Sequence, residues 1–294
     1  SVFECLTKYL DFVEVNYRKA TMAQAHKVCR SFIQHAGPYL QVADVTPRIV
    51  MGWLQVQAAT SGHKANKYRA ILSAAWTHGK FIDGFPQTMA NPVLQAPRFK
   101  HDRQERHIPS EDDFWRVHEA AEGQDRVLLL AYLHLGARKT ELYALRWHEV
   151  DWASNEVTLW TTKRKSGKQA DRLPMTKQLR EALRGWWEVR PVKESPFVFV
   201  HLSGHNAHRA LYGEPITNRH GWLKRLCDKA KVTPFTTHAI RHLTASVLYR
   251  QGNPMAVIQS ILRHTAPSTT ERYIQSLHTS GALLGALEGL ERRG

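Results

Sequence analysis

The residues between His238 and Tyr273 include the side-chain types that hold and attack a phosphate diester. His238 and Arg241 lie three positions apart in an apolar-periodic segment, so a helix would place an imidazole and a guanidinium on one face. His264 follows at the end of the next predicted helix, and Tyr273 comes nine residues later. Together these groups could bind one phosphate and supply a nucleophile that attacks it.

Turn and capping residues predict where the helices that carry these residues begin and end. Gly252 is expected to end the first helix, after which Asn253 is the predicted N-cap and Pro254 the predicted first residue of the next. A capping box that begins at Ser268 would restart a helix just ahead of Tyr273. The tyrosine is therefore expected on a short helix of its own.

Further cationic groups lie upstream of these helices. Glu141 follows Arg138 by three residues and would share its helical face, where it could orient the guanidinium. Taken alone, such an arginine also fits an ordinary surface ion pair. A basic loop, KRKSGKQAD, contains Lys163, Arg164, Lys165 and Lys168. This loop could attract phosphate nonspecifically or place one lysine in a DNA site.

Metal ligands do not accompany these groups, since the sequence holds no DxD pair and no HExxH motif. His201, His205 and His208 share one loop, but the span from His201 to His208 offers no acidic or thiolate partner and no helical scaffold, so we expect no metal site there. Guanidinium groups would then neutralise the phosphate, because their planar fork pairs two oxygens at once. No cofactor is expected.

Charge and composition narrow the class of protein. The chain has 294 residues, enough for two domains, and 43% of them are hydrophobic, as in globular proteins. Its 41 Lys and Arg against 26 Asp and Glu give a net charge of +15, which favours a nucleic acid as partner. No apolar run is long enough for a membrane span. Three scattered cysteines indicate a reducing, cytoplasmic environment.

The first part of the chain is expected to form a small all-α module. Apolar spacing and turn residues predict helices over about 2–18, from Thr21 to Gly37, from Pro47 onward, and over about 63–80. The fourth helix has a basic edge that includes Lys64 and Lys67. This edge could follow a DNA backbone or simply be solvated.

The pattern breaks between 84 and 109, where four prolines and a charged run predict a linker. We expect domains at 1–96 and 109–294, with the linker proper at 97–108. The second domain is predicted to be α+β. Its expected elements are a helix from 110, a buried helix over 126–135, a hairpin that turns at Ser154-Asn155, a third strand at 172–175, a helix over 177–190, a strand at 197–200 and helices over 215–230 and 281–293.

Taken in order, these segments resemble the boxes of the tyrosine recombinases of the phage integrase family. GARKTELYALRWHEVD is similar to the first arginine box, HAIRH to the His-x-x-Arg box, and LRHTAPSTTERY to the final box with its tyrosine. Lys165-Ser166-Gly167 resembles the segment with the catalytic lysine, although an insertion in this loop would make Lys163 the equivalent residue. The four-helix module ending at Asn91-Pro92 resembles the core-binding domain.

The resemblance implies a reaction without metal or ATP. Tyr273 would attack the scissile phosphate and form a covalent 3′-phosphotyrosine, while Arg138 and Arg241 stabilise the transition state. Lys165 would protonate the leaving 5′-oxygen, His238 would assist proton transfer, and His264 would hydrogen-bond the phosphate. Glu141 would orient Arg138 without contacting the phosphate itself.

The resemblance also implies partners and a setting. Site-specific recombination would use double-stranded DNA, a homotetramer assembled on it through the 281–293 helix, and possible accessory DNA-bending proteins. The setting would be the cytoplasm of a bacterial or phage-infected cell, near the nucleoid. Three other functions fit parts of the pattern: a type IB topoisomerase, a telomere resolvase, and a noncatalytic DNA-binding protein on the same fold.

Overall fold

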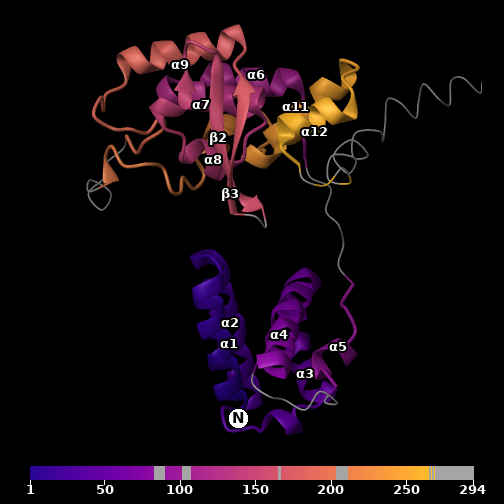
Figure 1. Cartoon of the computed structure of the whole chain (residues 1–294). Coiled ribbons are helices and arrows are strands. Elements are labelled where there is room, and N and C mark those ends of the chain that lie inside the picture. The colour runs from indigo at the N-terminus through magenta and orange to yellow at the C-terminus, as the bar shows by residue number, and fades with distance from the viewer. Residues whose placement is uncertain are drawn as a thin grey trace, which may run out of the picture. The chain divides into compact units, whose positions relative to one another are not determined.

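The computed structural model describes residues 1–82, 90–100, 107–164, 167–202 and 211–264, together with positions 266 and 268. The chain divides into two compact units, Ser1–Gln104 and Glu105–Gly294 (Figure 1). In the ranges given above, no helix has both the length and the apolar character needed to cross a membrane. Mostly helical structure with a small antiparallel sheet confirms the predicted fold class.

The first unit contains the four predicted helices and a short fifth. They are α1 (Val2–Asn16), α2 (Lys19–Ala36), α3 (Pro47–Ala58), α4 (Gly62–Ile82) and α5 (Pro92–Gln95), with a 3-10 turn η1 (Val42–Asp44) before α3. Thr46 caps α3 as its spacing predicts, because its hydroxyl accepts from the Ile49 N–H at 3.3 Å and Pro47 takes the first position. The second helix begins two residues before the predicted Thr21, since Arg18 is extended and forms its N-cap.

Aromatic residues fill the centre of the first unit. Phe32 and Trp53 are almost fully buried, and their rings meet edge to face at 5.1 Å. Asn66 of α4 binds Phe99 through both main-chain groups, at 2.8 and 2.9 Å. The Arg69 Nε donates to the Ala96 carbonyl at 2.8 Å. The chain from α5 to Phe99 is therefore fastened to α4.

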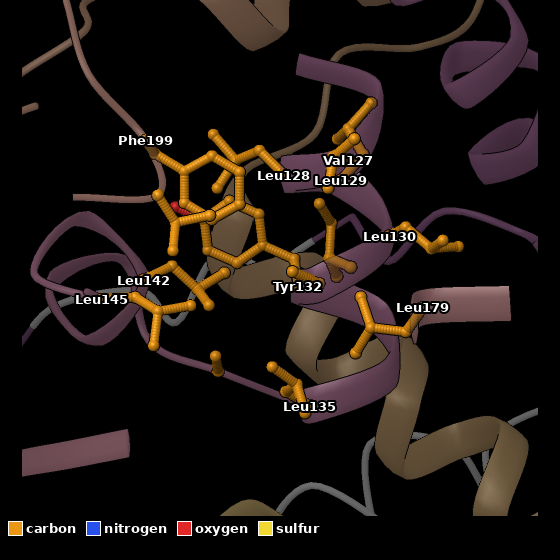
Figure 2. Close-up of a cluster of buried hydrophobic side chains, with 14 of the residues drawn as sticks. Val127, Leu128, Leu129, Leu130, Tyr132, Leu135, Leu142, Leu145, Leu179 and Phe199 are labelled. Atoms are coloured by element: carbon orange, nitrogen blue, oxygen red, sulfur yellow. The ribbon is translucent and has the colours of Figure 1, made fainter. Parts of the chain in front are cut away.

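The second unit is built around a buried helix. Its helices are α6 (Glu111–Ala120), α7 (Gly123–Leu135), α8 (Lys139–Tyr143), α9 (Lys177–Val189), α10 (Trp222–Lys229), α11 (Thr237–Arg250) and α12 (Met255–Leu262), with a 3-10 turn η2 (Trp147–Glu149). Figure 2 shows side chains of α7, such as Leu128 and Tyr132, together with Phe199 and Leu142 from other segments. Apolar residues on all sides of α7 predicted this central position.

A three-stranded antiparallel sheet in the order β1-β2-β3 completes the second unit. The strands are β1 (Val150–Asp151), β2 (Glu156–Arg164) and β3 (Gly167–Pro174), and Val157 faces Leu173 in the register. The third strand is much longer than predicted, since most of the expected basic loop pairs with β2 as far as Arg164 and Gly167. Charged side chains hid this strand because its exposed face needs no apolar residues.

Two other boundary predictions were wrong. Residues 197–200 form isolated bridges rather than a strand, because the Gln124 side-chain amide bonds both main-chain groups of Val200, at 2.9 and 3.1 Å. The helix predicted from 215 begins only at Trp222, since Gly221 takes a left-handed conformation with φ 68° and ends any helical path before it.

The start of α12 also differs by one residue. Pro254 is the N-cap and Met255 the first helical residue. The Asn253 side chain donates instead to the Leu248 carbonyl at 2.9 Å, so it closes the end of α11 rather than capping α12. The predicted stop at Gly252 is confirmed by its φ of 78°.

Candidate active site

Helix α11 carries both His238 and Arg241, but in different surroundings. Thr236 caps the helix by accepting from the Ala239 N–H at 3.2 Å. His238 is exposed on the first turn, and its ring meets the His242 ring edge to face at 5.0 Å. Arg241 is only 1% exposed. The shared helix was predicted, whereas the burial of the arginine was not.

The Arg241 guanidinium joins the ends of two other helices. Its Nη1 donates to the Gly136 carbonyl, just after α7, and its Nη2 donates to the Leu262 carbonyl at the end of α12. Carbonyl oxygens at helix ends lack intrahelical donors, so a cation is stabilised there. Arg241 thus fixes the segment before His264 against the segment before Arg138.

Gly136 is required at this junction for two reasons. Its φ of 49° is left-handed, which favours glycine, and a Cβ there would lie 2.9 Å from the Leu262 Cδ2 atom. The turn at Gly136 leads the chain from buried α7 to Arg138, the N-cap residue of α8. Close contact with α12 therefore depends on the absence of a side chain.

Arg138 and Glu141 form the ion pair that their spacing predicts. The Arg138 Nη1 lies 2.7 Å from Glu141 Oε1, and the Arg138 main-chain N–H donates to Glu141 Oε2 at 2.8 Å. Thr161 of β2 adds two bonds, since it accepts from Arg138 Nη1 at 3.1 Å and donates to Glu141 Oε1 at 2.5 Å. Arg138 keeps 23% of its side chain exposed, while its guanidinium is held by the buried Glu141 and Thr161.

Arg263 is a member of this cluster that the sequence did not identify as one. Its side chain is 1% exposed, and its Nη2 lies 2.8 Å from Glu141 Oε2. No local pattern links it to Glu141, which lies 122 positions away.

Electrostatics keep Glu141 ionised. Burial alone would raise the pKa of its carboxyl, but Arg263 and then the Arg138 N–H, the Thr161 hydroxyl and the Arg138 guanidinium outweigh this effect and hold the pKa at about 2. The carboxylate therefore carries its charge at any working pH and binds two guanidinium groups at once.

The same surroundings keep His264 neutral. Burial lowers the pKa of its imidazole, and the cations Arg241, Arg138 and Arg263, with His238, lower it further, to about 3. Arg241 donates to the Leu262 carbonyl and the Arg138 Nη2 lies 3.5 Å from the Arg263 carbonyl oxygen, so both guanidinium groups lie against the main chain directly before His264. A neutral imidazole next to arginines offers one N–H donor to an anion.

Three residues considered for catalysis lie partly or wholly outside the described residues. Lys165 and Tyr273 lie outside the described residues, as do the 281–293 helix and the predicted capping box apart from Ser268 itself. Lys163 belongs to β2 by its main chain, and its side chain is likewise outside the description. The choice between the two lysines stays a prediction.

Lys168 and Arg164 belong to the hairpin rather than to a loop, in β3 and β2 respectively. The Lys168 Nζ lies 4.5 Å from the centroid of the Trp160 ring, a cation–π contact. Lys168 and Trp160 also line a cavity of about 530 Å³ that reaches Glu141 and Arg146. Lys168 is thus near the arginine cluster, while the Arg164 side chain is outside the description.

The predicted basic edge of α4 is only partly open to solvent. Lys67 is exposed, whereas Lys64 is half-buried with its Nζ 5.5 Å from the centroid of the Tyr68 ring. Arg69, on the same edge, is occupied by main-chain carbonyls of Leu94 and Ala96. The edge therefore offers fewer charges than its sequence suggests.

Metal ligation finds no support in the described part of the chain, where no three His, Cys, Asp or Glu residues are grouped to hold an ion. His205 and His208 lie outside it. The described residues bring together the partly exposed Arg138 side chain before α8, the neutral His264 imidazole after α12 and the exposed His238 of α11. This arrangement suits an anion.

The second unit matches the sequence profile of the Phage integrase family over residues 110–279, more than half of the chain. The chain belongs to this family, whose members are tyrosine recombinases. It is 27% identical over 252 residues to "Tyrosine recombinase XerC" of Erythrobacter litoralis, which covers 82% of this chain and 75% of that protein. A XerC of Staphylococcus aureus (strain JH9) is 25% identical over 64% of this chain and 62% of its own length.

Solved structures share the fold. The Tn1549 transposon integrase in complex with transposon right end DNA superposes with a TM-score of 0.75 at 16% identity, covering 100% of this chain and 99% of that one. A lambda integrase tetramer bound to a Holliday junction gives a TM-score of 0.70 at 17% identity, over 92% of this chain and 76% of that one. At these identities the likeness concerns the fold alone.

Proposed function

We propose that the chain is a site-specific DNA recombinase that cuts and rejoins double-stranded DNA through a covalent 3′-phosphotyrosine, without metal or ATP. The observation that carries this proposal is the meeting of Arg138, Arg241 and His264. They come from three segments, and the guanidinium groups of Arg138 and Arg241 each donate to a main-chain carbonyl of the two residues directly before His264. Such a cluster can bind a phosphate diester, and a tyrosine that follows it in the chain can attack the bound phosphate.

In the proposed reaction, Tyr273 attacks the scissile phosphorus and the 5′-oxygen leaves. The bond energy is kept in the tyrosyl ester, so religation needs no ATP. Arg138 holds nonbridging oxygens and stabilises the charge that develops on them, and neutral His264 donates a hydrogen bond. Lys165 protonates the leaving oxygen, with Lys163 as its alternative, and His238 assists proton transfer.

Arg241 requires a separate step. Both of its terminal nitrogens donate to main-chain carbonyls in this structure. To contact a phosphate, its guanidinium exchanges at least one of those carbonyls for a phosphate oxygen. Because the Leu262 carbonyl directly precedes Arg263 and His264, this exchange would also shift the segment that leads to Tyr273.

The proposed partners follow from charge and from the family. A net charge of +15 suits a duplex bound by both units, with Lys64 and Lys67 in the first and Lys163, Arg164 and Lys168 in the second. Residues 1–96 would act as the core-binding domain, 97–108 as the linker and 109–294 as the catalytic domain. Recombination of two duplexes would use a homotetramer, with the 281–293 helix packed onto the next protomer and accessory DNA-bending proteins as possible helpers.

The test is capture of the covalent intermediate. The full chain is incubated with a pool of nicked duplexes of randomised sequence, so that cleavage releases a short strand and traps the adduct. We expect a denaturation-resistant protein–DNA adduct that forms in EDTA and disappears in Tyr273→Phe. An adduct that persists in this variant, or no adduct with any duplex, contradicts the proposal.

A further inference from the structure

Arg263 occupies a main-chain conformation that an arginine rarely adopts. It follows α12 as the C-cap with φ 53° and ψ 45°, in the left-handed region. A side chain there costs on the order of 1 kcal/mol relative to glycine, the residue that usually ends a helix in this way. Something in the fold must therefore favour the arginine side chain over glycine.

Both terminal nitrogens of the Arg263 guanidinium are hydrogen-bonded inside the second unit. Its Nη1 donates to the Leu135 carbonyl at 2.9 Å and to the Ile261 carbonyl at 2.8 Å. Its Nη2 lies 2.8 Å from Glu141 Oε2 and 3.4 Å from the Gly136 carbonyl oxygen. One side chain thus connects the end of α7, the end of α12 and the carboxylate of α8.

Glu141, which binds Arg263, also binds Arg138. Arg263 and the Arg138 N–H share Oε2, while the Arg138 guanidinium and the Thr161 hydroxyl share Oε1. The Arg138 Nη2 also reaches the Arg263 carbonyl oxygen at 3.5 Å. The Arg263 side chain therefore binds Glu141, which holds Arg138, and the Arg263 main-chain carbonyl contacts Arg138 directly.

We propose that Arg263 is a positioning residue for the reaction: it fixes the Glu141 carboxylate and thereby holds the Arg138 guanidinium in the orientation that receives the phosphate. The proposal rests on the proposed function for the identity of the anion. It assigns to Arg263 a role outside the six residues that the resemblance implies. Arg263 acts through Glu141 and does not contact DNA, because its side chain is 1% exposed.

Charge supports this geometry. Arg263 is the largest influence that keeps the Glu141 pKa low, ahead of both groups of Arg138. Burial lowers the pKa of the Arg263 guanidinium, and Glu141 and then Asp171 of β3 offset this only in part. Further ionisable groups line the cavity that reaches Glu141, namely Arg146, His148, Glu149 and Lys168. Without Arg263, burial would raise the Glu141 pKa, and a protonated carboxyl would lose its ionic hold on Arg138.

Two variants of Arg263 and one control separate the effect of the Arg263 guanidinium from the effect of its left-handed backbone. Arg263→Gly removes the side chain and suits the left-handed conformation, whereas Arg263→Lys keeps a charge without the planar fork. Arg219→Ala is the matched control, because it breaks a half-buried ion pair with Asp125 elsewhere in the second unit. Each variant is measured for single-turnover cleavage of the selected nicked duplex across pH, and for titration of the Glu141 carboxyl by ¹³C NMR.

We expect Arg263→Gly to lower the cleavage rate roughly 100-fold, the scale of a displaced guanidinium, with Arg263→Lys in between. The Glu141 pKa and the acid limb of the rate profile should both rise by about one to three pH units, as when a close opposite charge is lost. Arg219→Ala should leave both midpoints unchanged. Wild-type rates and an unchanged Glu141 pKa in Arg263→Gly overturn the proposal, as does an equal shift in Arg219→Ala.

The two proposals fail in distinguishable ways. If the wild-type chain forms no adduct at any pH, the proposed function falls, and the Glu141 titration still decides the positioning role. A raised Glu141 pKa in Arg263→Gly then supports the positioning of Arg138 for some other anion, and an unchanged value refutes it.

Discussion

Two Arg-x-x-Glu segments lie close together in the chain, Arg138 to Glu141 and Arg146 to Glu149. In both, the carboxylate accepts from the main-chain N–H of the arginine that precedes a short helical turn, at 2.8 Å in the first and 2.7 Å in the second. The two local structures are therefore nearly the same.

Their surroundings differ. Glu141 is 4% exposed and receives further donors from Thr161 and Arg263. Glu149 is half-buried, and the Arg146 guanidinium lies over the Phe197 ring at 5.2 Å. Identical spacing thus makes a helix cap in both places, and only contacts from distant segments turn one of them into a rigid support for a guanidinium.

The largest expected difference between the two segments is in catalysis. Arg138→Ala should lower the single-turnover rate of adduct formation by a factor of about 10³ or more, the usual value of an arginine that stabilises a transferring phosphoryl group. Arg146→Ala should change this rate by no more than about threefold, since its guanidinium rests on an aromatic ring at the surface. Equal losses in the two variants would mean that both arginines serve the site.

Stability should separate the two glutamates next. Glu141→Gln leaves two guanidinium groups without their carboxylate, and removing one partner of a buried pair costs about 3 to 5 kcal/mol. Glu149→Gln should cost about 1 kcal/mol or less, because it weakens the hydrogen bond from the Arg146 main-chain N–H that caps the turn. Urea unfolding of both variants at pH 7 gives the two values. A loss in Glu149→Gln as large as in Glu141→Gln contradicts the comparison.

The two glutamate variants should also differ in how their stability depends on pH. The Glu141 pKa is about 2 in the folded chain, below its ordinary value of 4.5. Its stabilisation, about 3 kcal/mol, is therefore complete above pH 4.5 and is lost as the pH falls towards 2. Glu141→Gln should lack this part of the acid destabilisation, while Glu149→Gln should keep it.

The smallest expected effect on stability concerns Thr161, the residue of β2 that binds Glu141 and Arg138. Thr161→Val removes the hydroxyl that bonds both Glu141 and Arg138, at a cost of about 1 to 2 kcal/mol. Thr158→Val changes a half-buried threonine of the same strand and should be nearly neutral, because valine suits a strand. Calorimetric unfolding of both variants measures the difference. Equal effects would show that the hydroxyl of Thr161 contributes nothing specific.

Several features of the fold were predictable because they depend on neighbouring residues. Thr46 with Pro47 marks the start of α3, and Gly136 and Gly252 end helices in left-handed conformations. The order of the boxes was enough to predict the family, which the match over residues 110–279 confirms. By contrast, β3 was underestimated because an exposed strand of charged residues carries no apolar alternation.

By itself, the sequence determined where α3 begins and where α11 ends, that Glu141 would meet Arg138, and which family the chain belongs to. Caps, turns and three-residue spacings act over a few positions, so they can be read without the fold. Only the tertiary structure decided that Arg241 is buried between two carbonyls and that Arg263 shares Glu141 with Arg138. The depth at which a charge lies depends on segments more than 100 residues away, and no local pattern contains that information.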